Sequence, residues 1–281
     1  MLWLAPALGT IALVALFPLV WTFWESLHRH DLRMPWLGRP FVGLGNYAEM
    51  LGDGRFLGAI GRTLLFALAS VTLEVGLGLA AALLLHRRIA GLGALRTAIL
   101  LPWALPTVVA AMLWRFLFDS EAGAVALMLE RSGARPVVWF AHEVLAWVPI
   151  VLADVWKTTP FVALLLLAGL QQIPREVEEA AAIDGAGAWR RLVSITLPMI
   201  RPMLLVAIAF RSLDALRVFD LIYVLSGGGP GTATEPIALY TFNAYFQNLR
   251  FGYGSALAVA LFVMTVAIGA VSVRLFAKEP A

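Results

Sequence analysis

Residues 144–198 read VLAWVPIVLADVWKTTPFVALLLLAGLQQIPREVEEAAAIDGAGAWRRLVSITLP and contain the two patterns that decide the fold. The first part, residues 144–170, is an apolar run longer than the roughly 20 residues that cross a hydrocarbon core of about 30 Å. The second part, residues 173–198, is rich in charged residues and alanine. The stretch therefore predicts a membrane-spanning helix that leads directly into a structured polar loop.

Runs of the same kind recur along the chain, and the composition agrees with them. The 281 residues are 61% hydrophobic and 14% charged, against about 45–50% apolar and about 25% charged in soluble domains. Six spans are predicted, at residues 2–27, 60–85, 95–118, 144–170, 203–225 and 255–276. All should be helices, because an isolated strand in lipid leaves its backbone polar groups unpaired. We therefore expect an all-α membrane protein with one transmembrane domain over residues 1–281.

Charge and cysteine content exclude several classes of function. The 21 Lys and Arg exceed the 18 Asp and Glu by only three, and they are scattered, so no nucleic-acid partner is expected. The absence of cysteine excludes disulfides, thiolate metal sites and cysteine catalysis. Basic residues are densest in the 86–96 turn and the 171–201 loop, and by the positive-inside rule this face is cytoplasmic. Both termini would then be cytoplasmic, with the Gly/Pro-rich connections 28–59 and 226–254 outside.

The loop at residues 173–198 has the pattern of two short helices. Pro174 suits a first helical turn, and the glutamates that follow favour its N-terminal end. Asp184-Gly185 is a turn dipeptide, helical spacing then resumes, and Pro198 is expected to close the second helix. From the residues alone, the hairpin either connects two spans or docks into a protein groove.

The spacing within this loop resembles the EAA loop of ABC importer permeases. Glu179-Ala180-Ala181 is followed by three residues, Gly185, nine residues and then Ile195-x-Leu197-Pro198. Other segments resemble the carbohydrate-uptake branch of that family, which includes maltose, trehalose and glycerol-3-phosphate permeases. They are FVGLGNY at 41–47, LPWALP at 101–106, FD at 118–119, DVWKTTPF at 154–161 and VFDLIYVLSGGGPG at 218–231. The resemblance implies a six-helix, type I, maltose-permease-like bundle.

The same resemblance implies how such a chain works. Glu179 would meet an ATPase subunit, Ala180 and Ala181 would permit close approach, and Gly185 would make the turn. The remaining ATPase-coupling residues would be Asp184, Ala186, Ile195, Leu197 and Pro198. Expected partners are a second, different permease, two ATPase subunits, an extracytoplasmic sugar-binding protein and the lipid bilayer. ATP and Mg²⁺ would bind the ATPases, so no cofactor, metal or catalytic residue is expected here. The cargo would be a carbohydrate, most simply trehalose or maltose, with oligosaccharide or glycerol phosphate as alternatives.

Ionisable residues inside the spans need a reason, because each costs at least about 2.5–3.5 kcal/mol at a helix centre. In the fourth span, Asp154, Lys157, Thr158 and Phe161 share a face, on which Asp154 can neutralise Lys157. In the fifth span, charges of alternating sign recur every three residues at Arg211, Asp214, Arg217 and Asp220.

These groups either pack against each other or a second permease, or they line a sugar pocket with aromatic platforms. By resemblance, the substrate path would include Trp103, Thr107, Asp154, Trp156, Lys157, Thr158, Phe161, Arg211, Asp214 and Arg217. Glu74 and Arg115 are expected to be structural.

Other motifs do not support an enzyme. His142-Glu143 begins like a zinc-protease motif, but Ala146 stands where its second histidine is required. The glycine-rich run at 227–232 lacks the lysine of a P-loop. The main alternative is a self-contained secondary transporter or channel that uses the charged ladder as an ion relay.

Overall fold

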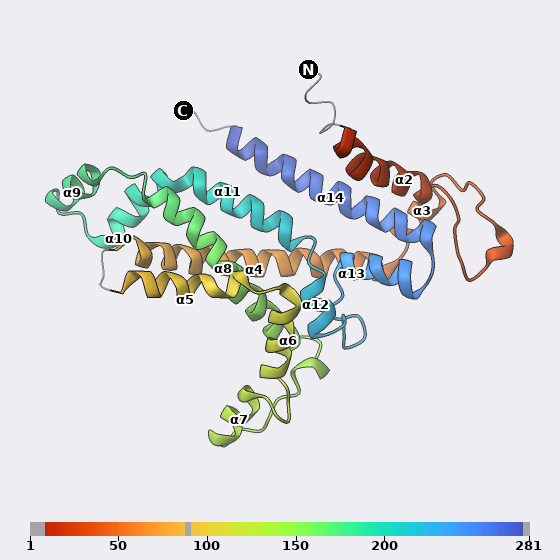
Figure 1. The fold of residues 1–281 in the computed structure, drawn as a ribbon, viewed down its shortest axis with the longest axis horizontal. Helices are drawn as coiled ribbons and strands as arrows, with labels where there is room; N and C mark the ends of the chain where they lie inside the picture. Colours follow the sequence, from red (N-terminus) through yellow and green to blue (C-terminus); the bar gives the residue numbers. More distant parts are fainter. Residues whose placement is uncertain (1–8, 88–90, 278–281) are drawn as a thin grey trace. The chain divides into compact units, whose positions relative to one another are not determined.

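Helices dominate the computed structural model, which describes residues 9–87 and 91–277 (Figure 1). The α-helices are α2 Phe17–Ser26, α3 Gly45–Leu51, α4 Gly54–His86, α5 Leu92–Ala104, α6 Thr107–Leu117, α7 Ala124–Arg131, α8 Trp147–Leu170, α9 Arg175–Ile183, α10 Ala188–Arg191, α11 Leu197–Ala215, α12 Asp220–Leu225, α13 Ile237–Phe242 and α14 Phe251–Ala277. Shorter π or 3-10 turns are η2 Ala12–Leu16, η3 Pro35–Leu37, η4 Trp139–Ala141, η5 Leu192–Thr196 and η6 Asn243–Gln247. Within those ranges no strand forms, which confirms the all-α prediction.

The apolar helices are long enough to cross a membrane. Five qualify by length and composition, namely Gly9–Ser26, Gly54–His86, Trp147–Leu170, Ala188–Ala215 and Phe251–Ser272. A sixth span results if Gly93–Ala104 and Thr107–Leu117 are counted together. Many of the large apolar side chains on these helices are exposed, as a lipid environment requires.

The third predicted span, residues 95–118, is not one straight helix. Its two halves meet at an angle of 98°. Leu105 and Pro106 are extended, with ψ of 138° and 139°. A proline disfavours helical backbone at the residue before it and cannot donate the next helical hydrogen bond, so the helix breaks there.

The fifth predicted span, residues 203–225, is also wrong at both ends. The span begins at Ala188 and ends at Ala215, and Pro198 lies inside it rather than closing a helix. The π-helical turn Leu192–Thr196 ends two residues before the proline. Because the regular pairing is already interrupted at that junction, the missing N–H of Pro198 is tolerated.

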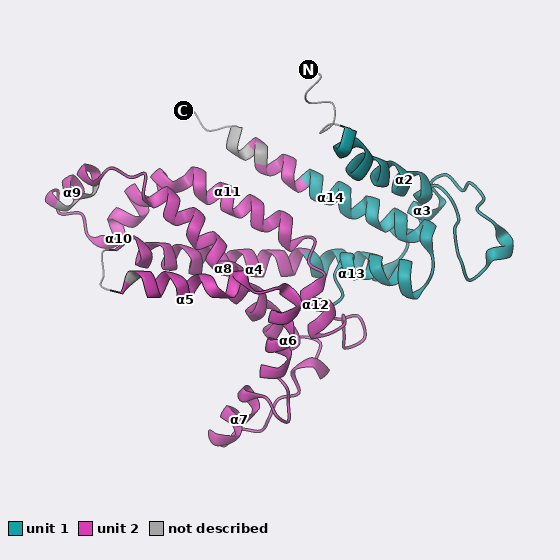
Figure 2. Cartoon of the chain, in the orientation of Figure 1, with its two compact units in different colours: residues 1–63, 235–267 teal, residues 64–234, 268–281 magenta. Residues whose placement is uncertain are grey.

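The chain divides into two compact units, and each unit consists of two separate segments (Figure 2). The first consists of residues 1–63 and 235–267, and the second of residues 64–234 and 268–281. Helices α4 and α14 contribute residues to both units. The expectation of one transmembrane domain stays a prediction.

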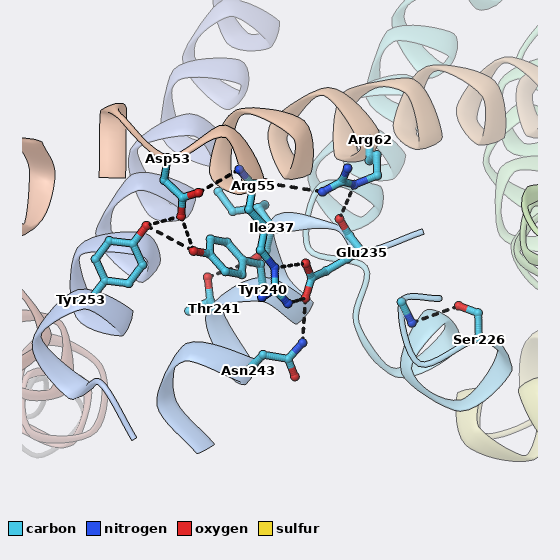
Figure 3. A network of polar contacts seen from close by, with 11 residues as sticks. Asp53, Arg55, Arg62, Ser226, Glu235, Ile237, Tyr240, Thr241, Asn243 and Tyr253 are labelled. Carbon is cyan, nitrogen blue, oxygen red and sulfur yellow. Dashed lines mark hydrogen bonds and ion pairs between the residues drawn. The ribbon is translucent and has the colours of Figure 1, made fainter. Parts of the chain in front are cut away.

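The first unit is held together by an apolar cluster and a polar network (Figure 3). Arg55 donates two hydrogen bonds of 2.7 Å to the Glu235 carboxylate. The Asp53 carboxylate accepts hydrogen bonds from the hydroxyls of Tyr240 and Tyr253. Burial raises the pKa of Asp53, but these hydrogen bonds outweigh it and hold the pKa below its usual value. The network fixes the segment that begins at Glu235 to the start of α4.

The second unit is a helical bundle in which α8 packs against α5, α6, α11 and α12. Small residues allow the helices to approach closely. A Cβ at Gly78 of α4 would lie 2.6 Å from Cγ1 of Val162, and one at Gly169 would lie 3.0 Å from Cβ of Met203. A buried cluster fills the space between the helices: Ala82, Leu85, Val162, Leu166, Leu167, Leu170, Ile173, Ile200 and Ala207. This bundle carries every residue that the sequence assigned to coupling or to the substrate path.

Candidate functional site

The loop at residues 173–198 contains the predicted first helix and glycine turn, but its second helical segment continues without a break into α11. Helix α9 ends in the hydrogen bonds from Asp184 N–H to the Ala180 carbonyl (2.9 Å) and from Ala186 N–H to the Ala181 carbonyl (3.0 Å). Gly185 has a φ of +75°. A left-handed residue combined with a bond across five residues is the Schellman termination of a helix. The predicted turn at Gly185 is therefore confirmed, in a conformation that favours glycine.

The predicted coupling residues lie on different surfaces of this loop. Glu179, Ala180 and Asp184 are exposed, whereas Ala181 is buried. A cavity of about 590 Å³ separates α9 from the start of the next helix. Its lining includes Ala180, Ala181, Asp184, Ala186 and Ile195. Five residues that are dispersed in the sequence thus face one cavity.

The most exposed apolar side chain of the loop is Ile183, which the sequence analysis did not single out. It is 86% exposed at the end of α9. Single apolar side chains are common on protein surfaces, so Ile183 is of interest because it lies beside the left-handed Gly185. The same loop also exposes Trp189, at 76%.

Both ends of the loop are anchored in the bundle. Ile173 is buried in the core cluster with Ile200 of α11, and Leu197 packs against that cluster. Pro198 is exposed. Leu197 and Pro198 are therefore the first residues of α11 rather than part of a separate helix. The chain thus runs from α8 through α9 and α10 into α11 with packed residues at both junctions, and Figure 1 shows this path.

Three charged residues inside the bundle, Glu74, Asp154 and Arg211, form a buried cluster centred on Arg211. Its guanidinium binds both carboxylate oxygens of Glu74, at 2.5 and 2.8 Å, and the Asp154 carboxylate at 3.2 Å. It also pairs with Asp214 one turn along α11. Thr158 donates to Glu74 at 2.7 Å. Helices α4, α8 and α11 are thereby tied at one point, and Arg211 is only 2% exposed.

This arrangement corrects one predicted pairing. Asp154 contacts Arg211, not Lys157, which is half-buried and has no ion-pair partner among residues 9–87 and 91–277. Asp154 pairs with Arg211 rather than Lys157 because the planar guanidinium has several donors and can bind two carboxylates at once. The ladder is also interrupted, because α11 ends at Ala215. Arg217 donates instead to the carbonyl of Leu213 at 3.1 Å.

Aromatic side chains form a partly exposed row beside the break between α5 and α6. Trp103 stacks on Phe161, with ring centroids 6.0 Å apart, and Phe161 contacts Phe210 edge-on at 6.4 Å. Trp156 packs against Trp114 at 5.9 Å. Trp103 is 49% exposed and Phe210 is 62% exposed. The structure therefore places two predicted aromatic residues, Trp103 and Phe161, in one row with Phe210, and it pairs the third, Trp156, with Trp114.

Thr107 lies beside this row, as the first residue of α6, and is half-buried. Arg115 has the structural role expected of it, because it donates to the Val224 carbonyl at 2.8 Å and joins α6 to α12. Glu74 was expected to be structural, and its contacts agree with that. Its place at the centre of the charged cluster could have been inferred only from its polarity within an apolar helix.

Comparison with known proteins identifies the family. Residues 74–278 match the family model described as binding-protein-dependent transport system inner membrane component. This chain belongs to that family, and is thus a membrane component of an ABC importer rather than an enzyme.

Close relatives are named for sugar transport. The trehalose/maltose transport system permease protein MalF of Thermococcus litoralis is 46% identical over 94% of this chain and 89% of its own length. The trehalose transport system permease protein SugA of Mycobacterium tuberculosis is 40% identical over 97% of this chain and 86% of its own.

A chain of a bacterial ABC transporter involved in the import of the acidic polysaccharide alginate has the same fold. The TM-score is 0.87 at 21% identity, over 99% of this chain and 95% of that one.

Proposed function

We propose that this chain is one of two different permease subunits of an ATP-driven importer, and that its cargo is a disaccharide such as trehalose or maltose. Two ATPase subunits would contact the 173–198 loop. An extracytoplasmic sugar-binding protein would deliver the cargo. ATP and Mg²⁺ would bind the ATPases, and this chain would hold no cofactor.

The observation that carries the proposal is the exposed, anchored 173–198 loop. Ile183 and Glu179 project from α9, while Ile173 and Leu197 fix its two ends to the bundle. A partner that closes around α9 would cover the exposed isoleucine and move α8 and α11 together. Coupling requires that the ATPases stabilise one bundle conformation more than another.

The buried charged cluster makes such motion concerted. Arg211 links α11 to Glu74 of α4 and Asp154 of α8. Separating these helices would leave a charge unpaired inside the bundle, at a cost of about 3–5 kcal/mol. The three helices therefore move as one body when the loop is displaced.

The aromatic row supports a carbohydrate cargo. Sugars present C–H groups on their ring faces and hydroxyls at their edges, so an aromatic platform flanked by polar groups suits them. Trp103 and Phe161 supply the platform. Lys157 lies one turn before Phe161 on α8, and Thr107 begins α6, four residues after Trp103. The relatives named for trehalose and maltose transport favour a disaccharide over glycerol phosphate.

The proposed orientation of the chain in the membrane follows from the position of the loop. If α9 meets a cytoplasmic ATPase, the ends of α4 and α8 beside it are cytoplasmic, as the density of basic residues also indicates. An even number of spans then puts both termini in the cytoplasm.

Purification of the chain with its partner subunits tests the proposal. An ATPase should copurify, and its hydrolysis should rise when the binding protein and trehalose or maltose are added. Uptake of either sugar into vesicles should require ATP inside. Ion-driven uptake by the chain alone would instead establish a secondary transporter.

A further inference from the structure

A basic cavity of about 560 Å³ lies between the end of α4 and the 173–198 loop, and it adjoins the cavity under α9, with which it shares Ala181 and Ile195. Its polar wall contains His86 and Arg87 from the end of α4 and Arg191 from α10. No acidic residue lines it, and none of these three basic side chains has an ion-pair partner in the part of the chain that the structure describes. Two arginines that stay charged at every physiological pH thus face an open cavity without compensation.

The position of the cavity relative to the candidate spans points to its ligand. His86 is the last residue of one span, and the other span begins at Ala188. The two arginines therefore lie where apolar helix gives way to polar chain, which is the level of lipid headgroups in a bilayer. Trp189 also lines the cavity and is 76% exposed, as tryptophan is at a membrane interface.

The apolar wall of the cavity extends deeper along both spans. Leu83 lies four residues before Arg87 in the first span, and Ile195 lies four residues after Arg191 in the second. Four helical residues rise about 6 Å, so both apolar side chains are nearer the membrane centre than the arginines. A ligand that fills this cavity must carry a negative charge at one end and hydrocarbon at the other. Free phosphate would leave the apolar wall uncovered.

We propose that this cavity binds an anionic phospholipid, with the phosphate between Arg87 and Arg191 and an acyl chain along Leu83 and Ile195. Basic pockets between membrane helices recognise lipid headgroups in this way. The bound lipid joins the end of α4 to the start of the fifth span beside the loop, and the proposal does not depend on the identity of the cargo.

Quenching by brominated lipids tests the proposal on the full chain in detergent micelles. The probe is brominated phosphatidylglycerol, with brominated phosphatidylcholine as the neutral comparison. The difference between the unmodified chain and the Trp189→Phe variant isolates the Trp189 signal. We expect phosphatidylglycerol to quench this signal at far lower concentration than phosphatidylcholine. We expect inorganic phosphate to compete weakly.

Paired arginine variants provide the control. Arg87→Gln combined with Arg191→Gln should lower the affinity for phosphatidylglycerol about 30-fold, taking about fivefold for each arginine. Arg131→Gln combined with Arg135→Gln removes two exposed arginines elsewhere and should change nothing.

Equal quenching of the Trp189 signal by the two lipids would overturn the proposal. So would an unchanged affinity in the Arg87/Arg191 variant. Displacement by phosphate at the same concentration as by lipid would assign the cavity to a free anion instead.

Discussion

Replacing Gly185 by alanine should weaken the docking of the ATPase without disturbing membrane insertion. The φ of +75° costs a non-glycine residue about 1–2 kcal/mol. A Cβ at this position meets no atom within 4 Å, so no steric term is added. Because the alanine variant can leave the left-handed conformation in the undocked loop and must regain it on docking, that cost corresponds to at most about a 5- to 30-fold drop in affinity. The assay is the concentration of purified ATPase subunit that half-saturates the permease complex in vesicles.

Two further variants separate backbone conformation from other effects. Gly185→Asn should lose less, because asparagine enters the left-handed region more readily. Gly187→Ser is the matched control, since Gly187 has a φ of −64° as the N-cap of α10 and serine is favoured there. The reasoning is refuted if Gly187→Ser impairs docking as much as Gly185→Ala, or if Gly185→Ala binds normally.

Three other substitutions test the packing and charges of the two units. Arg211→Met leaves two buried carboxylates without their partner and should lower the free energy of unfolding by about 3–5 kcal/mol, measured by denaturation in micelles; unchanged stability would remove the cluster from the account. Gly78→Ala should cost about 1–3 kcal/mol by overpacking α4 against α8, whereas Gly76→Ala, whose Cβ meets nothing, should cost nothing in the same measurement. The hydrogen bond from Arg33 lowers the pKa of Asp31 to about 2. The stabilisation that ionised Asp31 gives to the folded state is therefore complete above the unfolded value near 3.8 and is lost as the pH falls toward 2. Asp31→Asn should flatten the acid-unfolding profile in that window, and an unaltered profile would contradict this.

The sequence was sufficient for features that depend on neighbouring residues. Apolar runs of sufficient length locate the spans because the bilayer sets the length of a helix. Asp184-Gly185 predicts the turn because few residues other than glycine adopt a left-handed backbone at low cost. The helical spacing on α11 also predicted the pair of Arg211 with Asp214, which are one turn apart.

Features that depend on distant residues were not predictable in the same way. Glu74 and Arg211 are 137 positions apart, and nothing local to either one indicates that they meet. Opposite charges three residues apart on a helix pair at Arg211 and Asp214, but Asp154 and Lys157, with the same spacing, do not. There the guanidinium of Arg211, from another helix, pairs with Asp154 instead. Proline gave opposite results at two sites. Pro106 breaks its helix. Pro198 is accommodated within a helix, next to a π-helical turn that the sequence does not predict.

Cross-linking from Ile183 tests the central claim most directly. The chain contains no cysteine, so an Ile183→Cys variant has a single thiol. Val144→Cys is the matched control, because Val144 is 78% exposed and lies three residues before α8, at the predicted outer end of the fourth span. After treatment of intact membranes with a thiol-to-amine cross-linker, the account predicts that Ile183→Cys joins an ATPase subunit and Val144→Cys does not. Cross-linking to the ATPase from Val144→Cys but not from Ile183→Cys would contradict it.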